Sequence, residues 1–141
     1  MSAFRTPQVI LFSDDLPRAV AFYVRLGFTE TFRVPMEGEP IHVDLSLDGY
    51  KIGIASAAST RDDHGLDPLV HGQRAAVVLW TDDTTAAYDA LVADGAPALA
   101  PPHAWLDRLL IAWTADPDGN PVQIAQSMAR PAAGQKPDGP S

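Results

Sequence analysis

The sequence predicts an α+β fold built from two βαβββ modules in tandem, and three observations support this class. A strand-then-helix pattern near the N-terminus recurs 68 residues later without a gap, so that Asp14 corresponds to Asp82 and Gly27 to Gly95. Strand signals follow each of the two helices. The chain has 141 residues, which is enough for one domain that folds without a disulfide or metal.

The first module begins with an apolar, partly β-branched run at 9–12, which predicts a buried strand. Asp15 is a suitable N-cap for the helix that follows, and Pro17 fits its first turn, where a missing backbone N–H is tolerated. Gly27 suits the left-handed position after a helix end. Strands are expected at 30–34, 41–47 and 51–55, with a hairpin turn at 47–50.

The second module repeats this order. An apolar run at 77–80 predicts its first strand, and Asp83 and Gly95 are expected to begin and end its helix. Later strands are expected near Ala98, at 109–114 and at 121–126, with a turn at 116–120. The polar stretch 56–73 predicts a connecting loop, and the proline-rich stretch 128–141 predicts a flexible tail.

The composition indicates which binding partners and which cellular compartment to expect. The chain carries 18 acidic and 10 basic residues, for a net charge of −8, which disfavours nucleic acids and anionic membranes and favours cationic ligands. It has no cysteine, so disulfides, thiolate metal sites and cysteine nucleophiles are excluded. Residues 1–8 lack a signal-peptide pattern and no apolar run approaches 18 residues, so we expect a cytoplasmic protein.

Two motifs carry a resemblance to a known family. Residues 15–28, with the sequence DLPRAVAFYVRLGF, and the turn DPDGN at 116–120 resemble the vicinal oxygen chelate superfamily of glyoxalase I, bleomycin resistance proteins and extradiol dioxygenases. The resemblance implies one domain at 1–127, with modules at about 6–55 and 74–127 and a linker at 56–73. It further implies that the modules form a curled mixed sheet whose concave side is a ligand cleft.

The resemblance also locates the positions at which metal-dependent members carry His, Gln or Glu ligands. Here these positions correspond to Gln8, Ala76, Gln123 and either Gly53 or Ala55. Two neutral amides compete poorly with water for Zn²⁺, Ni²⁺ or Fe²⁺ when no imidazole or carboxylate joins them. We therefore expect no metal and no cofactor, as in the metal-free members that are like bleomycin resistance proteins.

Strand alternation supplies the candidate ligand-binding residues. If Gln8 faces the cleft, Phe12 does too, and its repeat mate Trp80 supplies a second aromatic wall for a planar ligand. Trp105 lies in an expected loop at 101–105, while the face of Trp113 depends on a strand register that the sequence leaves open. The full set is Gln8, Phe12, His42, Asp44, Trp80, Trp105, Trp113 and Gln123.

Three functional hypotheses follow. The leading one is a metal-independent, non-catalytic protein that sequesters an antibiotic-like small molecule, cationic or planar, as a homodimer. His42 and Asp44 share a strand face, and Asp44 is the acidic candidate to meet a cationic group. The alternative is a glyoxalase-like lyase or dioxygenase-type enzyme in which His42 joins Gln8 and Gln123 in an atypical metal site. The third is a protein-interaction or regulatory module whose aromatic loop docks on another protein.

Overall fold

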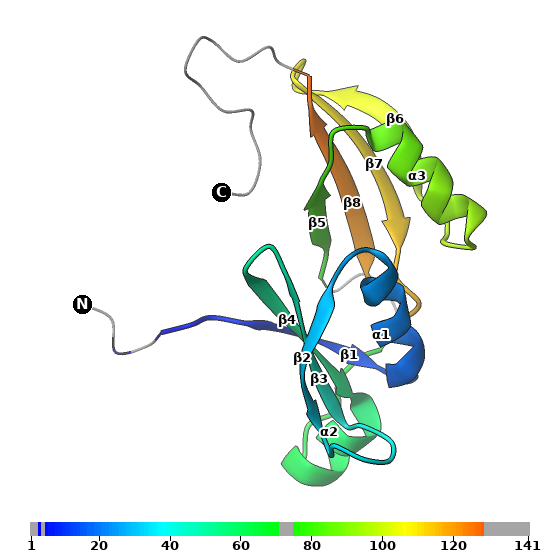
Figure 1. The fold of residues 1–141 in the computed structure, drawn as a ribbon. Coiled ribbons are helices and arrows are strands. Elements are labelled where there is room, and N and C mark those ends of the chain that lie inside the picture. The colour runs from blue at the N-terminus through cyan, green and yellow to red at the C-terminus, as the bar shows by residue number, and fades with distance from the viewer. Residues whose placement is uncertain (1–2, 4, 71–74, 129–141) are drawn as a thin grey trace. The chain divides into compact units, whose positions relative to one another are not determined.

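The computed structural model describes residues 3, 5–70 and 75–128, and the chain forms two compact units, Met1–Gly72 and Gln73–Ser141 (Figure 1). Each unit contains one βαβββ module, so the α+β class and the tandem order are confirmed. Most of the tail expected at 128–141 lies outside the described residues. In the described part of the chain, no helix is long and apolar enough to cross a membrane.

The first unit contains a four-stranded mixed sheet with the strand order β1-β4-β3-β2. The two neighbours β1 and β4 are parallel, and the remaining pairs are antiparallel. Its elements are β1 (Val9–Ser13), α1 (Leu16–Arg25), β2 (Thr29–Val34), β3 (His42–Leu47), β4 (Tyr50–Ser56) and α2 (Ala57–His64).

The second unit repeats this topology, with the strand order β5-β8-β7-β6. Again the first and last strands of the module, β5 and β8, pair in parallel, and the other pairs are antiparallel. Its elements are β5 (Val77–Trp80), α3 (Thr84–Ala93), β6 (Ala100–Trp105), β7 (Leu109–Ala115) and β8 (Pro121–Ser127).

The aspartates that were expected to begin the two main helices do so. The side chain of Asp15 accepts a hydrogen bond from the backbone N–H of Arg18 at 3.2 Å. Asp83 accepts one from the N–H of Ala86 at 3.0 Å. Each bond satisfies a donor that the first helical turn leaves without an intrahelical partner.

The glycines after the helices and the first hairpin turn also match the prediction. Gly27 and Gly95 have φ angles of 111° and 103°, which a residue with a side chain rarely adopts. Asp48 and Gly49 both have positive φ, at 52° and 82°. This is the conformation of a type I′ turn, whose twist matches that of the antiparallel strands it joins.

One helix was not predicted, since 56–73 was expected to be only a loop. Helix α2 occupies Ala57–His64, with the Ser56 side chain accepting from Ser59 N–H at 3.2 Å and Gly65 in the left-handed conformation. Ala57 and Thr60 are its buried residues, so the helix presents no apolar stripe. Without that periodicity, the sequence offers no signal of helix.

The segment 101–105, which was predicted to be a loop, is instead part of strand β6. This strand lies at the edge of its sheet, where proline is tolerated because one side of the strand needs no backbone donor. The register with β7 shifts between Ala100 and His103, across the two prolines. The prolines therefore mark an irregular edge strand rather than a connection.

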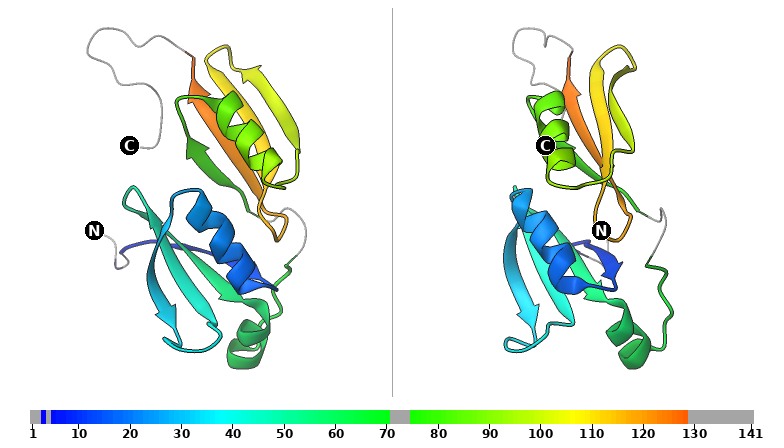
Figure 2. Two further views of the ribbon diagram at one scale, coloured as in Figure 1. Left: turned by 45° about the vertical axis from the view of Figure 1, so that its right-hand side comes forward. Right: turned by 90° about the vertical axis from the view of Figure 1, so that its right-hand side faces the viewer.

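Each sheet buries one face under its own helix (Figure 2). In the first unit Val43, Leu45 and Ile54 are fully buried, as is Tyr23 on α1. In the second unit Tyr88 on α3 packs with Ala112 and Ile124, and these three form a core cluster. Because side chains alternate along a strand, the residues between these core positions lie on the opposite face of each sheet. We call this second face the open face of the unit.

The turn at 116–120 depends on one buried carboxylate, and its removal should destabilise the chain. Asp116 is 3% exposed and accepts three hydrogen bonds of 2.9 Å, from the backbone N–H groups of Asp118 and Asn120 and from Asn120 Nδ2. Asp116→Ala would leave these buried donors without an acceptor, at a cost of about 2 kcal/mol or more. Urea unfolding measures the loss.

The control for this prediction is Asp89→Ala, which removes an exposed carboxylate from α3. It should change the free energy of unfolding by no more than about 0.5 kcal/mol. Equal effects of the two substitutions would show that the turn does not depend on the Asp116 hydrogen bonds.

Candidate functional site

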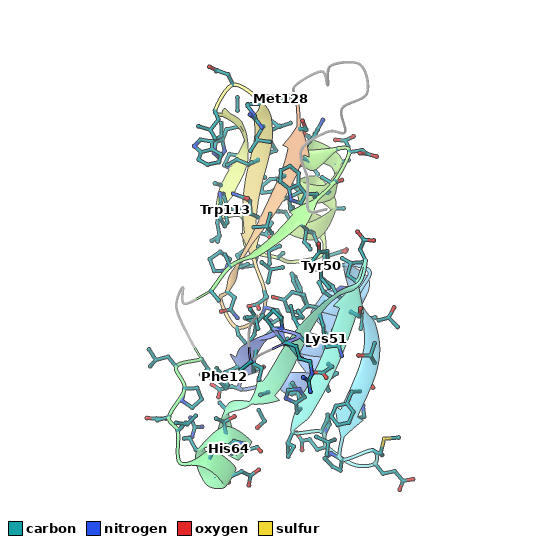
Figure 3. The ribbon with its side chains drawn as sticks, turned by 90° about the vertical axis from the view of Figure 1, so that its left-hand side faces the viewer. Phe12, Tyr50, Lys51, His64, Trp113 and Met128 are labelled. Atoms are coloured by element: carbon teal, nitrogen blue, oxygen red, sulfur yellow. The ribbon has the colours of Figure 1, made fainter. Side chains whose placement is uncertain are left out.

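The open face of the first unit gathers four of the predicted site residues. Phe12 on β1, which is labelled in Figure 3, lies opposite Ala55 on β4. Ala55 in turn lies opposite His42 on β3. Gly53, two residues before Ala55, lies opposite Asp44. Directly opposed residues on neighbouring strands share a face, so Phe12, His42 and Asp44 point to the same side of the sheet.

Gln8, His42 and Asp44 form a hydrogen-bonded group, which we call the Asp44 cluster. Gln8 Nε2 donates to Asp44 Oδ1 at 2.7 Å, and His42 Nε2 lies 2.7 Å from the same oxygen. Gly53 lies beneath this group: a Cβ atom there would come within 3.0 Å of both Gln8 Nε2 and His42 Cε1. The missing side chain therefore gives the Gln8 and His42 side chains their room over the sheet.

The cluster keeps Asp44 ionised. Burial alone would raise the pKa of Asp44, but the hydrogen bonds from His42 and Gln8, together with the charges of His42 and Lys51, outweigh burial and lower the pKa below its ordinary value. The ionised carboxylate therefore stabilises the fold above the ordinary pKa of an aspartate. This contribution is lost as the pH falls through the lowered pKa.

Exposed apolar side chains surround the Asp44 cluster. Phe32 on β2 lies opposite Asp44, is 51% exposed, and has its ring centroid 6.4 Å from that of His42. Ile10 lies opposite Gly53 and Val34 lies opposite His42, and both are also exposed. A half-buried carboxylate within an apolar surface is a place where a small molecule with both an apolar and a charged part can bind.

The open face of the second unit carries the other four predicted residues. Trp113 on β7 lies opposite Gln123 on β8, and Trp80 lies opposite Ala125, two residues further along β8. Trp105 on β6 lies opposite Leu109, which shares a face with Trp113 because it is an even number of residues away. The register thus decides the face of Trp113, which the sequence had left open (Figure 3).

The three tryptophans differ in exposure. Trp105 is 50% exposed, whereas Trp80 and Trp113 are half-buried. Trp105 lies on an edge strand rather than in the rigid loop that the sequence predicted. All three rings still project from the face opposite Tyr88 and its helix.

Comparison with known proteins assigns the family. The model of the Glyoxalase/Bleomycin resistance protein/Dioxygenase superfamily matches residues 5–124. The chain belongs to this superfamily. A search of curated proteins found no match.

Three solved structures are similar to this chain in fold. A glyoxalase/bleomycin resistance protein/dioxygenase from Nocardioides gives a TM-score of 0.73 at 22% identity, covering 96% of this chain and 91% of that one. TioX from Micromonospora sp. ML1 gives 0.68 at 23%, covering 84% and 95%. Lactoylglutathione lyase from Agrobacterium tumefaciens gives 0.63 at 24%, covering 86% and 92%. At these identities the likeness shows the fold alone.

The residues at the metal-ligand positions of the superfamily do not fit a divalent metal. Ile10 and Val78 are equivalent positions of the two modules, 68 residues apart. Gly53 lies opposite Ile10 and Gln123 lies opposite Val78, so Gly53 rather than Ala55 is the equivalent of Gln123. Gly53 and Ala76 have no donor atom. Gln8 uses its amide nitrogen to bind Asp44. Among the described residues, no group of three or more His, Cys, Asp and Glu side chains could hold a metal ion.

Two features of this site were missed at the level of sequence. Gln8 was predicted to bind a ligand and to occupy a metal-ligand position, but its hydrogen bond to Asp44 was not foreseen, because that bond requires β1 and β3 to pair with the same strand, β4. Phe32 was not singled out, because its place opposite Asp44 follows a register shift between Glu30 and Phe32. A shift of one residue changes the face of a side chain and leaves no mark in the sequence.

Removal of the Gln8 amide should raise the pKa of Asp44. In Gln8→Ala one of the two hydrogen bonds to Oδ1 is lost, so the ionised form is less favoured. The pKa is measured by NMR from the side-chain carboxyl carbon of Asp44. The matched control is Thr31→Val, which removes a donor to the backbone oxygen of Asp44 and should leave the carboxyl pKa unchanged. An unchanged pKa in Gln8→Ala would contradict the geometry of the cluster.

Proposed function

We propose that the protein reversibly binds a small, planar, cationic molecule on its open faces, without a metal. This is the activity of an antibiotic-sequestering member of the superfamily, similar to the bleomycin resistance proteins. The single observation that supports it most is the ionised Asp44 carboxylate, which lies half-buried among exposed apolar side chains.

The hydrogen bonding of Asp44 leaves an acceptor for a ligand. Both hydrogen bonds end on Oδ1, and Oδ2 accepts none from the described residues. When His42 is neutral, the Asp44 cluster carries one negative charge. A ligand ammonium or amidinium group could therefore donate to Oδ2 and form a charge-assisted hydrogen bond, which is stronger than a neutral one. The net charge of −8 would add long-range attraction for a cation.

The aromatic residues favour a planar ligand. Trp80, Trp105 and Trp113 share the open face of the second unit, and Phe12 and Phe32 share that of the first. A flat ring stacked on such side chains buries apolar area, and the aromatic residues lose few rotamers on binding. We further propose that the binding form is a cytoplasmic homodimer.

The residues at the metal-ligand positions favour binding over the lyase and dioxygenase alternatives. Those reactions use a metal to polarise the substrate, and positions 53 and 76 carry no donor. The proposed function needs only the carboxylate, the aromatic rings and the apolar surface that the chain itself supplies.

Titration with proflavine, a planar cation, tests the proposed function. Binding is followed by the anisotropy of the dye and by quenching of tryptophan fluorescence. Asp44→Asn should weaken proflavine binding roughly tenfold, because the charge-assisted hydrogen bond contributes about 1.5 to 3 kcal/mol in place of a weaker neutral one. Added salt should weaken binding to the wild type more than binding to Asp44→Asn.

Fluorescein, a planar anion, provides the comparison. It should bind more weakly than proflavine, and Asp44→Asn should not weaken it further. If the wild type binds no planar cation in a broad panel, or binds fluorescein as tightly as proflavine, the proposed function is wrong.

A further inference from the structure

We infer that the His42–Asp44 pair makes His42 Nδ1 a general base on the open face of the first unit. It would take a proton from a small planar molecule that carries an acidic C–H group. This activity goes beyond reversible binding and needs neither a metal nor a cationic ligand.

The contact with Asp44 fixes which ring nitrogen can act as the base. An ionised carboxylate only accepts hydrogen bonds, so the 2.7 Å contact with Oδ1 requires a hydrogen on His42 Nε2. In the neutral imidazole the lone pair then lies on Nδ1. A carboxylate that orients an imidazole and stabilises its protonated form is the arrangement that supports general-base catalysis by histidine.

The basic nitrogen is free and reachable. His42 Nδ1 has no hydrogen-bond partner among the described residues. Among the described residues, Thr114 Oγ1 is the one buried side-chain nitrogen or oxygen that lacks a hydrogen-bond partner. His42 Nδ1 also lacks a partner, so it is not a buried atom and is in contact with solvent. The side chain of His42 as a whole is 25% exposed. Nδ1 therefore lies at the solvent-exposed surface of the first unit with no hydrogen bond to break.

Two neighbours position the pair, and a third lies beside it. Gln8 donates to the same Asp44 oxygen that His42 contacts, which holds the carboxylate in one orientation. Gly53 leaves the space in which the His42 and Gln8 side chains lie, with 3.0 Å between its hypothetical Cβ and each. The exposed ring of Phe32 lies beside His42 and offers a surface for a planar substrate.

The reaction of 5-nitrobenzisoxazole tests the inference with a neutral, planar probe. His42 Nδ1 would take the proton from C3 of the probe. The C–H electron pair then forms the third bond of a nitrile as the ring N–O bond breaks, and the oxygen leaves as a phenolate. The product is 2-cyano-4-nitrophenolate, and the imidazolium returns its proton to solvent. No oxidant, reductant or metal takes part.

The full chain is assayed as wild type, His42→Gln and His64→Gln. His64 lies at the end of α2, and its substitution removes an imidazole outside the Asp44 cluster. His42→Gln should lower the rate above buffer background at least tenfold, and His64→Gln should leave it unchanged. Lys51, whose charge acts on Asp44, is present in every variant, so its amine cannot account for the difference.

Two further variants test whether the neighbours of His42 position its imidazole, as distinct from stabilising the fold. Asp44→Asn should lower kcat while KM changes little, because the imidazole loses its orienting carboxylate but the apolar surface remains. Gly53→Ala keeps every reacting group but crowds Gln8 and His42, so it should lower kcat as well. Circular dichroism and thermal melting establish that each variant is folded.

Nitrogen-15 NMR of the wild type gives a measurement that needs no variant. It should show neutral His42 with its hydrogen on Nε2 and an unprotonated Nδ1. The inference is overturned if the hydrogen is on Nδ1, if the wild type shows no rate above background, or if His42→Gln reacts as fast as the wild type. Because this probe is neutral, a failure of proflavine binding would not contradict the general-base inference. Equally, a failure of the elimination reaction would not contradict the proposed binding of a cation.

Discussion

The parallel pairing of the first and last strands of each module is the constraint on which the candidate site depends. Pairing of β1 with β4, and of β4 with β3, places Ile10, Gly53 and Asp44 in one row across the sheet. The equivalent pairing in the second unit places Val78, Gln123 and Trp113 in a row. Since the helix of each unit covers one face, these rows lie on the other face.

The same rows explain how this chain departs from metal-dependent members of its superfamily. The strand pairing brings together positions from which side chains could bind a metal. However, Gly53 has no side chain to act as a metal ligand, and the Gln8 side chain is hydrogen-bonded to Asp44. In the first unit, the Gln8 amide and the His42 imidazole instead both contact one carboxylate oxygen, Oδ1 of Asp44. Two of the expected metal-ligand positions, Gln8 and Gly53, are thus part of a polar cluster surrounded by exposed apolar side chains.

Most of the fold could be predicted because its signals are local. Asp15 and Asp83 cap helices through hydrogen bonds that span three residues, and Asp48 and Gly49 form a turn that needs only their own conformations. The errors occurred where local signals were weak or misleading. Helix α2 has no apolar stripe, and the prolines of β6 are tolerated because the strand lies at a sheet edge.

The sequence by itself determined the tandem βαβββ order, the acidic charge, the absence of cysteine and the aromatic residues available to a ligand. Only the tertiary structure decided that Gln8 and His42 bind the same oxygen of Asp44, that Gly53 makes room for them, and that Trp113 lies opposite Gln123. The physical reason is register. Alternation along a strand tells which residues share a face, but pairing between distant strands decides which of them meet.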